Sequence, residues 1–279
     1  MFITDNAQIR RRAAATAILL IPALLQMFPL FYLLCLSFKV GGEAMSYPPR
    51  ILPRALDWTN YGLALKAAPL GRFLLNSVIV ATAITALQVL TAILAAYALA
   101  RLEFPGRKIA FALIVATMLV PGEIAIIPNY FALARLGWID TYAGLVLPFA
   151  SSGFGVFLLY QFFRTIPKEL EEAAAQDGAS RLRFLFQIAV PLSAPAVTAF
   201  AVYAFINAWN MYLWPLVITQ STSMQTAQIG LGMFRSQNES MSWGVIMAAT
   251  AMLISPTVLL FVAAQRQFVR GLTMSGLKG

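Results

Sequence analysis

The stretch that decides the fold, residues 164–191, reads RTIPKELEEAAAQDGASRLRFLFQIAVP. Four of the eleven acidic residues of the chain fall within nine positions of it, at Glu169, Glu171, Glu172 and Asp177. Each of these charges would cost kilocalories if it were buried in hydrocarbon. The stretch is therefore predicted to lie in water or at a membrane surface, although almost all of the remaining chain is apolar.

The local sequence of this stretch predicts two short helices. Pro167 suits the first helical position, where its missing N–H costs nothing, and the acids that follow face the positive end of the helix dipole. The alanines 173–175 continue the helix, and Gly178 is expected to end it in the left-handed conformation. Ser180 can cap the second helix, which should end before Pro191 because proline disfavours helix in the residue before it.

The spacing of Glu172-Ala173-Ala174, Gly178, Ile188 and Val190-Pro191 resembles the EAA loop of importer-type ABC transporter permeases. Only Val190 departs from the usual pattern, which has leucine there. In that family the loop forms a coupling helix that seats in a cleft of the ATPase subunit. The resemblance implies an ATPase-coupling role for Glu171, Glu172, Ala173, Ala174, Asp177 and Gly178. The alternative is a solvated loop between two membrane spans.

Composition predicts a membrane protein. Hydrophobic residues make up 60% of the 279 and charged residues 11%, against roughly 25% charged in soluble domains. We expect an all-α, polytopic membrane protein with a single transmembrane permease domain over residues 1–279. The net charge of +9 fits basic cytoplasmic loops beside anionic lipid, so no nucleic-acid partner is expected.

The residue types argue against chemistry on this chain. The sequence has no His, which removes the commonest general base and the commonest metal ligand. It also has no Gly-x4-Gly-Lys-Ser/Thr loop to cradle a nucleotide phosphate. We expect no catalytic residue, no metal site and no cofactor on this chain, and any ATP and Mg would be bound by another subunit.

Apolar runs predict six transmembrane helices, at about 13–36, 73–100, 109–134, 142–163, 191–219 and 242–264. A short interfacial helix near 58–67 is expected in the outer connection 37–72, a polar outer loop at 220–241, and a basic tail at 265–279. Pro121-Gly122 and Pro128 should break the third span. Basic residues favour the side that holds the 164–191 loop, so both termini are predicted to be cytoplasmic, and the resemblance implies a bacterial inner membrane.

An interrupted helix makes Glu123 and Asn129 the first candidates for a substrate pathway. Glu123 is the only acid placed within a predicted span, and Asn129 follows Pro128. Broken helices at membrane depth free backbone groups where they line a cavity, and an intramembrane acid is by default a functional hypothesis. The alternative is that Glu123 merely caps the break near the outer surface.

A polar and aromatic cluster provides the second set of pathway candidates: Trp209, Asn210, Tyr212 and Trp214. Aromatic faces stack on sugar rings, and an asparagine amide both donates to and accepts from hydroxyls. Such a cluster suits a neutral polyol. The alternative is an aromatic belt at the outer membrane surface.

Nearly the whole chain resembles the carbohydrate-uptake branch of these permeases, the maltose and glycerol-3-phosphate-like importers. The matching segments are Asn76-Ser77, residues 97–101 and 104–106, Trp209-Asn210, and a tail that ends in Lys278-Gly279. Residues 212–215 and 228–231 look most like the glycerol-3-phosphate type. A phosphate ligand would want Arg or Lys in the cavity, and no predicted span contains one, although basic groups from a partner permease could supply the charge.

The resemblance implies one of two membrane-spanning subunits of a binding-protein-dependent ABC importer for a sugar, polyol or glycerol-3-phosphate-like solute. The expected partners are a second permease subunit, two ATP-binding subunits, an extracytoplasmic solute-binding protein and the lipid bilayer. A heterodimer of permeases is expected, with a homodimer as the lesser option. The alternative function is an ion-coupled secondary transporter, which would want several intramembrane acids or an inverted repeat. An intramembrane enzyme would need a clustered nucleophile and base.

Overall fold

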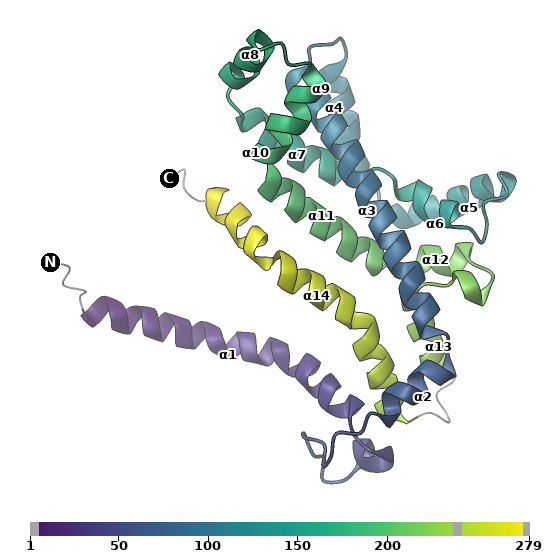
Figure 1. Cartoon of the computed structure of the whole chain (residues 1–279). Coiled ribbons are helices and arrows are strands. Elements are labelled where there is room, and N and C mark those ends of the chain that lie inside the picture. The colour runs from purple at the N-terminus through teal and green to yellow at the C-terminus, as the bar shows by residue number, and fades with distance from the viewer. Residues whose placement is uncertain (1–5, 237–241, 276–279) are drawn as a thin grey trace. The chain divides into compact units, whose positions relative to one another are not determined.

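The computed structural model describes residues 6–236 and 242–275, and in these ranges every regular element is a helix. Part of the predicted outer loop (237–241) and the predicted terminal Lys278-Gly279 lie outside the described residues. Figure 1 labels the main helices. The elements are α1 (Asn6–Ser37), η1 (Gly41–Met45), α2 (Thr59–Ala67), α3 (Leu70–Arg101), α4 (Arg107–Thr117), η2 (Gly122–Ala125), α5 (Ile126–Arg135), α6 (Tyr142–Val146), η3 (Leu147–Phe149), α7 (Gly153–Thr165), α8 (Lys168–Gln176), α9 (Arg181–Phe184), the π-helix η4 (Leu185–Ala189), α10 (Val190–Leu192), α11 (Ala194–Trp209), α12 (Leu213–Ile218), η5 (Thr222–Met224), α13 (Ala227–Ser236) and α14 (Trp243–Ser275).

Three helical segments in the described ranges are long and apolar enough to cross a membrane: Thr16–Ser37, Leu70–Arg101 and Trp243–Ala263. Three bent helix pairs also pass that test, with bends of 93° between α4 and α5, 46° between α6 and α7, and 82° between α10 and α11. Counting each bent pair as one span gives six, the number that the sequence predicts, although the fifth pair covers Arg181–Trp209 and not the predicted 191–219. The predicted all-α, polytopic membrane fold is confirmed.

The breaks within the spans differ from those predicted. The third span breaks before Pro121, as expected, because proline has no N–H to donate and disfavours helix in the preceding residue. Pro128 does not break it. This residue lies in the first turn of α5, where the missing N–H would have no partner within the helix.

Two further breaks were not predicted. The fourth span stops at Phe149 and restarts at Gly153, where the Ser152 hydroxyl caps α7 by accepting from the Gly155 amide at 3.2 Å. The fifth span stops at Trp209 and restarts as α12, with Pro215 in its first turn. Both restarts depend on capping or proline geometry, which a count of apolar residues does not register.

The prediction that helix would end before Pro191 was wrong. The chain stays helical through that residue, with a π-helical turn at η4 in which the Val190 amide donates to the Leu185 carbonyl five residues back. In an α-helix the proline ring would collide with the Gln187 carbonyl and leave it without a donor. The wider π turn accommodates this and carries the chain from the 164–191 loop toward α11.

The chain divides into two compact units, residues 1–70 with 231–254, and residues 71–230 with 255–279. In the first unit the short helix predicted near 58–67 is present as α2. The buried Asn60 amide on α2 donates to the carbonyls of Ser37 at 3.0 Å and Lys39 at 2.8 Å, which ties α2 to the end of α1. Gly244 lies against this amide, because a Cβ there would be 2.5 Å from the Asn60 side-chain nitrogen.

In the second unit, Asn76-Ser77 near the start of α3 anchors the segment that leads into α13. The Asn76 amide donates to the carbonyls of Ser223 and Gln225, each at 2.8 Å, and the Ser77 hydroxyl accepts from the Ala227 amide at 2.8 Å. These bonds give a structural reason for a feature that the sequence only matched to a family. They also shape the predicted outer loop, which contains two helices that were not predicted, η5 and α13.

Asp140, between α5 and α6, fixes the chain just after α12. Its amide donates to the Ile218 carbonyl at 2.9 Å, and its carboxylate accepts from the amides of Gln220 at 2.9 Å and Ser221 at 3.1 Å. Partial burial acts to raise the pKa of Asp140, but these hydrogen bonds outweigh it and hold the pKa below its usual value. Asp140 adopts a positive φ of 58°, which aspartate tolerates better than most residues.

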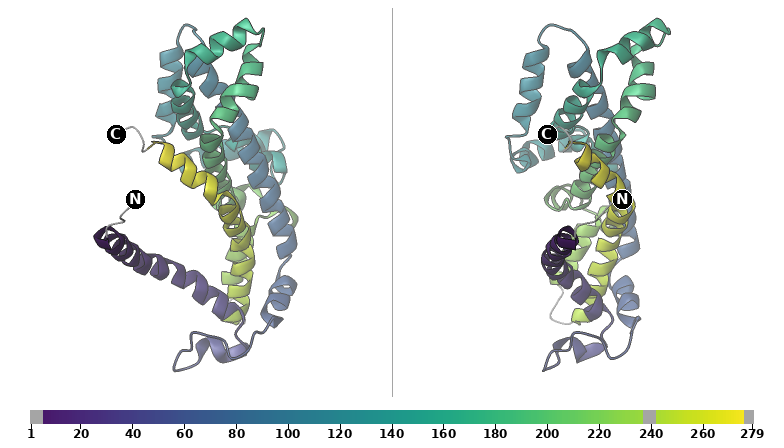
Figure 2. Two further views of the ribbon diagram at one scale, coloured as in Figure 1. Left: turned by 60° about the vertical axis from the view of Figure 1, so that its left-hand side comes forward. Right: turned by 90° about the vertical axis from the view of Figure 1, so that its left-hand side faces the viewer.

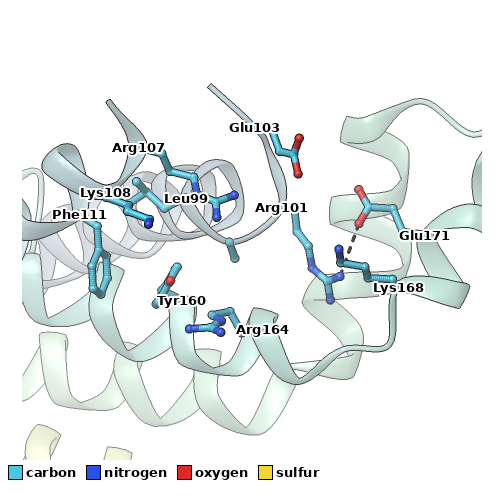
Figure 3. A pocket seen from close by; sticks show the side chains of 11 residues that line it. Leu99, Arg101, Glu103, Arg107, Lys108, Phe111, Tyr160, Arg164, Lys168 and Glu171 are labelled. Carbon is cyan, nitrogen blue, oxygen red and sulfur yellow. Dashed lines mark ion pairs between the residues drawn. The ribbon is translucent and has the colours of Figure 1, made fainter. Parts of the chain in front are cut away.

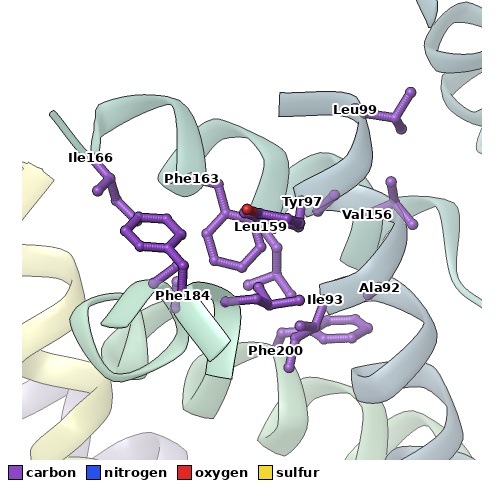
Figure 4. Packing of buried hydrophobic residues seen from close by; sticks show 14 of the residues in the cluster. Ala92, Ile93, Tyr97, Leu99, Val156, Leu159, Phe163, Ile166, Phe184 and Phe200 are labelled. Carbon is purple, nitrogen blue, oxygen red and sulfur yellow. The ribbon is translucent and has the colours of Figure 1, made fainter. Parts of the chain in front are cut away.

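The core of the second unit lies where α3, α7, α9 and α11 meet (Figure 4). Phe163 and Phe200 are fully buried there, and Tyr97 packs edge-on against Phe163 with ring centroids 6.3 Å apart. α7 packs against both α4 and α11, as two further views also show (Figure 2). Gly155 permits the close approach of α11, because a Cβ there would lie 2.1 Å from the Phe200 ring.

Gly155→Ala is therefore expected to lower the free energy of unfolding by about 1–3 kcal/mol, because the ring of Phe200 is fully enclosed and must shift. Combining it with Phe200→Leu should restore part of the loss. Gly71→Ala is the matched control, because nothing lies within 4 Å of its added Cβ. Thermal denaturation of the purified protein in detergent measures all three variants. An unchanged midpoint for Gly155→Ala would contradict the close packing of α7 on α11.

Candidate functional site

The candidate coupling helix of the 164–191 loop is α8. The prediction placed Pro167 at its first helical position, but Pro167 is the N-cap, with an extended ψ of 141°, and the helix starts at Lys168. The correction is one residue. Glu169 and Glu171 lie in the first turn, where their charges complement the positive end of the helix dipole.

The predicted end of α8 and the predicted cap of α9 are confirmed. Gly178 is left-handed with φ +76°. The Ala179 amide donates to the Ala174 carbonyl at 2.9 Å across this turn, which satisfies a carbonyl that the helix end leaves open. Two residues on, the Ser180 hydroxyl accepts from the Arg183 amide at 3.3 Å and starts α9.

α8 has an inner and an outer face, which divide the predicted coupling residues. Ala174 is 6% exposed and belongs to the same buried cluster as Phe163 and Phe184. Glu171, one helical turn before it, is partly buried, while Asp177 and Gly178 are exposed after the helix. We call the exposed stripe with helical spacing the outer face of α8; it consists of Glu169, Glu172, Ala173 and Gln176.

Arg101, the last residue of α3, holds α8 in place and was not among the predicted site residues. Its guanidinium donates to the carbonyl of Phe163 at 3.1 Å and 2.7 Å and to that of Ile166, at the end of α7. It also forms an ion pair with Glu171 at 3.6 Å, drawn in Figure 3. The Tyr97 hydroxyl lies 3.5 Å from the same carboxylate.

The contribution of the Arg101 contacts to stability depends on how deeply the two side chains are buried. The Arg101 side chain is 6% exposed and that of Glu171 is 30% exposed. A buried guanidinium needs its donors satisfied, and the forked geometry of arginine allows one side chain to serve two carbonyls and a carboxylate at once. Arg101 therefore joins α3, α7 and α8 at a single point. The only sequence signal for it was its place in the segment 97–101.

The candidate pathway residues near the third-span break are placed differently from one another. Glu123 is exposed in η2, at the break itself, whereas Asn129 is partly buried in the first turn of α5. α5 packs against α12. The helix that carries Asn129 thus adjoins the helix that carries Trp214.

The 209–214 cluster divides into buried indoles and exposed polar groups. Trp209 and Trp214 are 2% and 3% exposed. The Trp214 indole donates to the Gly144 carbonyl at 3.1 Å, and Trp209 stacks on Phe205 with centroids 5.8 Å apart. Asn210 and Tyr212 are exposed at the break between α11 and α12.

Asn210 and Tyr212 are therefore the members of this cluster that a ligand or a partner can reach. The Asn210 side-chain oxygen accepts from the Gln228 side-chain amide at 3.3 Å. The Asn210 NH2 group takes no part in this bond and is a donor that a ligand could use. The indoles act in packing within this chain. Sequence reasoning could group these four residues but could not separate them.

A family model described as "Binding-protein-dependent transport system inner membrane component" matches residues 88–274. The chain is 38% identical over 264 residues to the sn-glycerol-3-phosphate transport system permease protein UgpE of Yersinia pestis bv. Antiqua (strain Antiqua), covering 92% of this chain and 94% of that protein. It is 41% identical over 219 residues to the protein of the same name from Salmonella choleraesuis (strain SC-B67), covering 78% of each.

Two solved structures share the fold. One is a bacterial ABC transporter involved in the import of the acidic polysaccharide alginate, with a TM-score of 0.83, 23% identity, and coverage of 96% of this chain and 100% of that chain. The other is a bacterial alginate ABC transporter in complex with alginate pentasaccharide-bound periplasmic protein, with a TM-score of 0.60, 15% identity and 96% coverage of both. With the family match and the relatives at 38% identity or more, these findings establish that the chain belongs to the family of binding-protein-dependent transport system inner membrane components.

Proposed function

We propose that this chain is one of two membrane-spanning subunits of an ABC importer and that α8 is the helix through which ATPase subunits move it. The observation that carries the proposal is α8 itself. It presents an exposed outer face of two glutamates, an alanine and a glutamine, while its inner face is fixed to α3 and α7 by Ala174 and Arg101. A docking helix must be open on one side and firmly attached on the other to transmit motion.

The coupling step follows from that attachment. When the ATPase subunits close on ATP, a force on the outer face of α8 passes through Arg101 to α3 and α7, and through the buried cluster to α11. These helices then move together, and the pathway changes from inward-facing to outward-facing. ATP biases the change because it binds the closed state better than the open one. In this scheme ATP and Mg are bound by the partner subunits, and α8 lies on the cytoplasmic side together with both termini.

For the substrate we propose a small polyhydroxylated solute, with sn-glycerol-3-phosphate as the first to test. The names of the relatives favour it, and the exposed amide of Asn210 and phenol of Tyr212 suit hydroxyl groups. No Lys or Arg lies in the described range 195–230 around them. The second permease or the solute-binding protein would supply the charge that a phosphate requires.

The experiment that tests this function is uptake into proteoliposomes that contain the chain with its partner permease, ATPase subunits and solute-binding protein. We expect sn-glycerol-3-phosphate to accumulate only when ATP is present on the side of the membrane that carries the ATPase subunits. Accumulation should persist when an uncoupler collapses the proton gradient. Uptake that follows the proton gradient without ATP would instead identify the ion-coupled alternative.

Asn210→Ala is expected to raise the apparent KM for uptake by about threefold to tenfold, the value of one lost hydrogen bond. Assembly should be normal, because the side chain is exposed. Tyr47→Ala, at a tyrosine that is 95% exposed in the 46–58 segment, is the control for removal of an exposed polar side chain. Initial uptake rates against substrate concentration give both values. If KM for Asn210→Ala equals that of the control, the 210–212 break is an outer-surface feature and not part of the pathway.

A further inference from the structure

A basic cleft lies between the end of α3, the start of α4, α7 and the start of α8 (Figure 3). Its volume is about 470 Å³. Five basic side chains line it, against two acids: Arg101, Arg107, Lys108, Arg164 and Lys168. The basic loop residues in the sequence predict a basic cytoplasmic side in general, but not that these five side chains line one cleft.

The positive charges in this cleft are only partly neutralised. One acid, Glu171, is already paired with Arg101, and the other, Glu103, forms no ion pair among the described residues. Arg164 lies over the Tyr160 ring at 5.7 Å. Neither Lys108 nor Lys168 forms an ion pair with any residue that the structure describes. A concave surface with an excess of three positive charges favours an anion with several acceptor oxygens.

The surface beside the cleft indicates that this anion has an apolar part. Lys108 and Arg107 also line an adjoining hollow together with Phe104 and Ile109. Along α4 from there, Ile109 is 67% exposed and Leu113 is 64% exposed. A ligand whose phosphate occupied the cleft could therefore lay an acyl chain along α4, whereas a free phosphate would leave this apolar strip unused.

We propose that the cleft binds the headgroup of an anionic phospholipid, phosphatidylglycerol, from the leaflet that faces the ATPase subunits, with its acyl chains along Ile109 and Leu113. Basic clefts at the cytoplasmic ends of membrane helices attract such headgroups. The lipid would bridge Lys108 on α4 and Lys168 on α8. The proposal rests on the proposed function in one respect, the cytoplasmic location of α8.

The test uses the purified importer complex in neutral detergent, with lipid binding measured by native mass spectrometry. The probes are phosphatidylglycerol and phosphatidylcholine with the same acyl chains, and inorganic phosphate alone. The variant is Lys108→Gln with Lys168→Gln. The control, Lys66→Gln with Arg135→Gln, removes the same two charges from exposed positions elsewhere.

We expect phosphatidylglycerol to bind the native complex more tightly than phosphatidylcholine, and the variant to lose about tenfold or more of that affinity, with the control unchanged. Equal losses in variant and control would overturn the site and leave only diffuse attraction. Displacement of the lipid by inorganic phosphate at equal concentration would show a free-anion site. Tighter lipid binding after removal of the ATPase subunits would show that an acidic part of those subunits occupies the cleft, which also overturns the proposal. ATP-driven uptake in phosphatidylcholine vesicles, measured separately, tests the proposed function whatever the lipid result.

Discussion

Gly178→Val is expected to reduce ATP-driven uptake by about 5–30-fold while the complex continues to hydrolyse ATP. The residue has φ +76°, where a side chain with a Cβ costs about 1–2 kcal/mol and a β-branched one is a clear outlier. That cost corresponds to about 5–30-fold in the population of the native turn. The loss of this turn would break the 6→1 hydrogen bond from the Ala179 amide to the Ala174 carbonyl and shift the cap at Ser180. Under the proposed function, α8 would then be misplaced relative to the ATPase subunits.

At Gly178 the effect of backbone strain can be distinguished from the effect of added side-chain bulk. No atom lies within 4 Å of a Cβ built on Gly178, so the Cβ itself has open space and the strain expected for a side chain there comes from the backbone. Gly178→Asn is the matched control, because asparagine tolerates positive φ, and it should keep most of the uptake. Subunit content, uptake and ATPase rate are measured on the same preparations. Equal uptake by the two variants would show that the left-handed turn is not needed for coupling.

The C-terminal end of α8 and the cap of α9 could be predicted from the sequence because they depend on local chemistry. Gly178 ends the helix in the left-handed conformation, and Ser180, two residues later, caps the next one. Neither outcome requires knowledge of the rest of the fold. The same is true of α2 in the outer connection and of the long apolar helices, whose composition suffices.

The orientation of α8 could not be predicted, because it depends on residues far away in the chain. The sequence presents Ala173 and Ala174 as equivalent, yet only Ala174 packs into the buried cluster with Phe184, and only Glu171 meets Arg101. The aromatic cluster has the same limitation. Trp214 is buried because Gly144 offers a carbonyl to its indole, and no pattern within 209–214 indicates that partner.

Arg101→Met is expected to have the largest effect on stability among the charged residues of the site, a loss of about 3 kcal/mol. The substitution leaves the carbonyls of Phe163 and Ile166 without these donors and removes the ion pair to Glu171. A hydrogen bond to a charged group contributes roughly 1.5–3 kcal/mol, and breaking a buried pair is more costly than breaking an exposed one. The midpoint of thermal denaturation of the purified complex, followed by light scattering, measures the loss.

Three further variants rank the contributions of the Arg101 hydrogen bonds, its ion pair and its charge to stability. Arg101→Lys keeps the charge but lacks the fork that reaches two carbonyls and a carboxylate, so most of the loss should persist. Glu171→Gln should cost less than about 1 kcal/mol, because that carboxylate is 30% exposed and the pair is 3.6 Å long. Arg135→Met, at an exposed arginine in the last turn of α5, controls for the removal of an arginine. If Glu171→Gln loses as much stability as Arg101→Met, the stabilisation comes mainly from the ion pair and not from the hydrogen bonds to the carbonyls.

Stability and coupling can be distinguished at Arg101, because the two carbonyls belong to α7 and the carboxylate belongs to α8. If Arg101 transmits motion, Arg101→Met should lower the amount of substrate moved per ATP hydrolysed even in the fraction that remains assembled at low temperature. If it only holds α7 against α3, that ratio should stay at the native value while the denaturation midpoint falls. The first result supports the proposal that motion of α8 is transmitted to α3 and α7 through Arg101. The second would shift the attachment of α8 to the packing of Ala174 in the buried cluster, and Ala174→Gly would then be the variant that lowers the ratio.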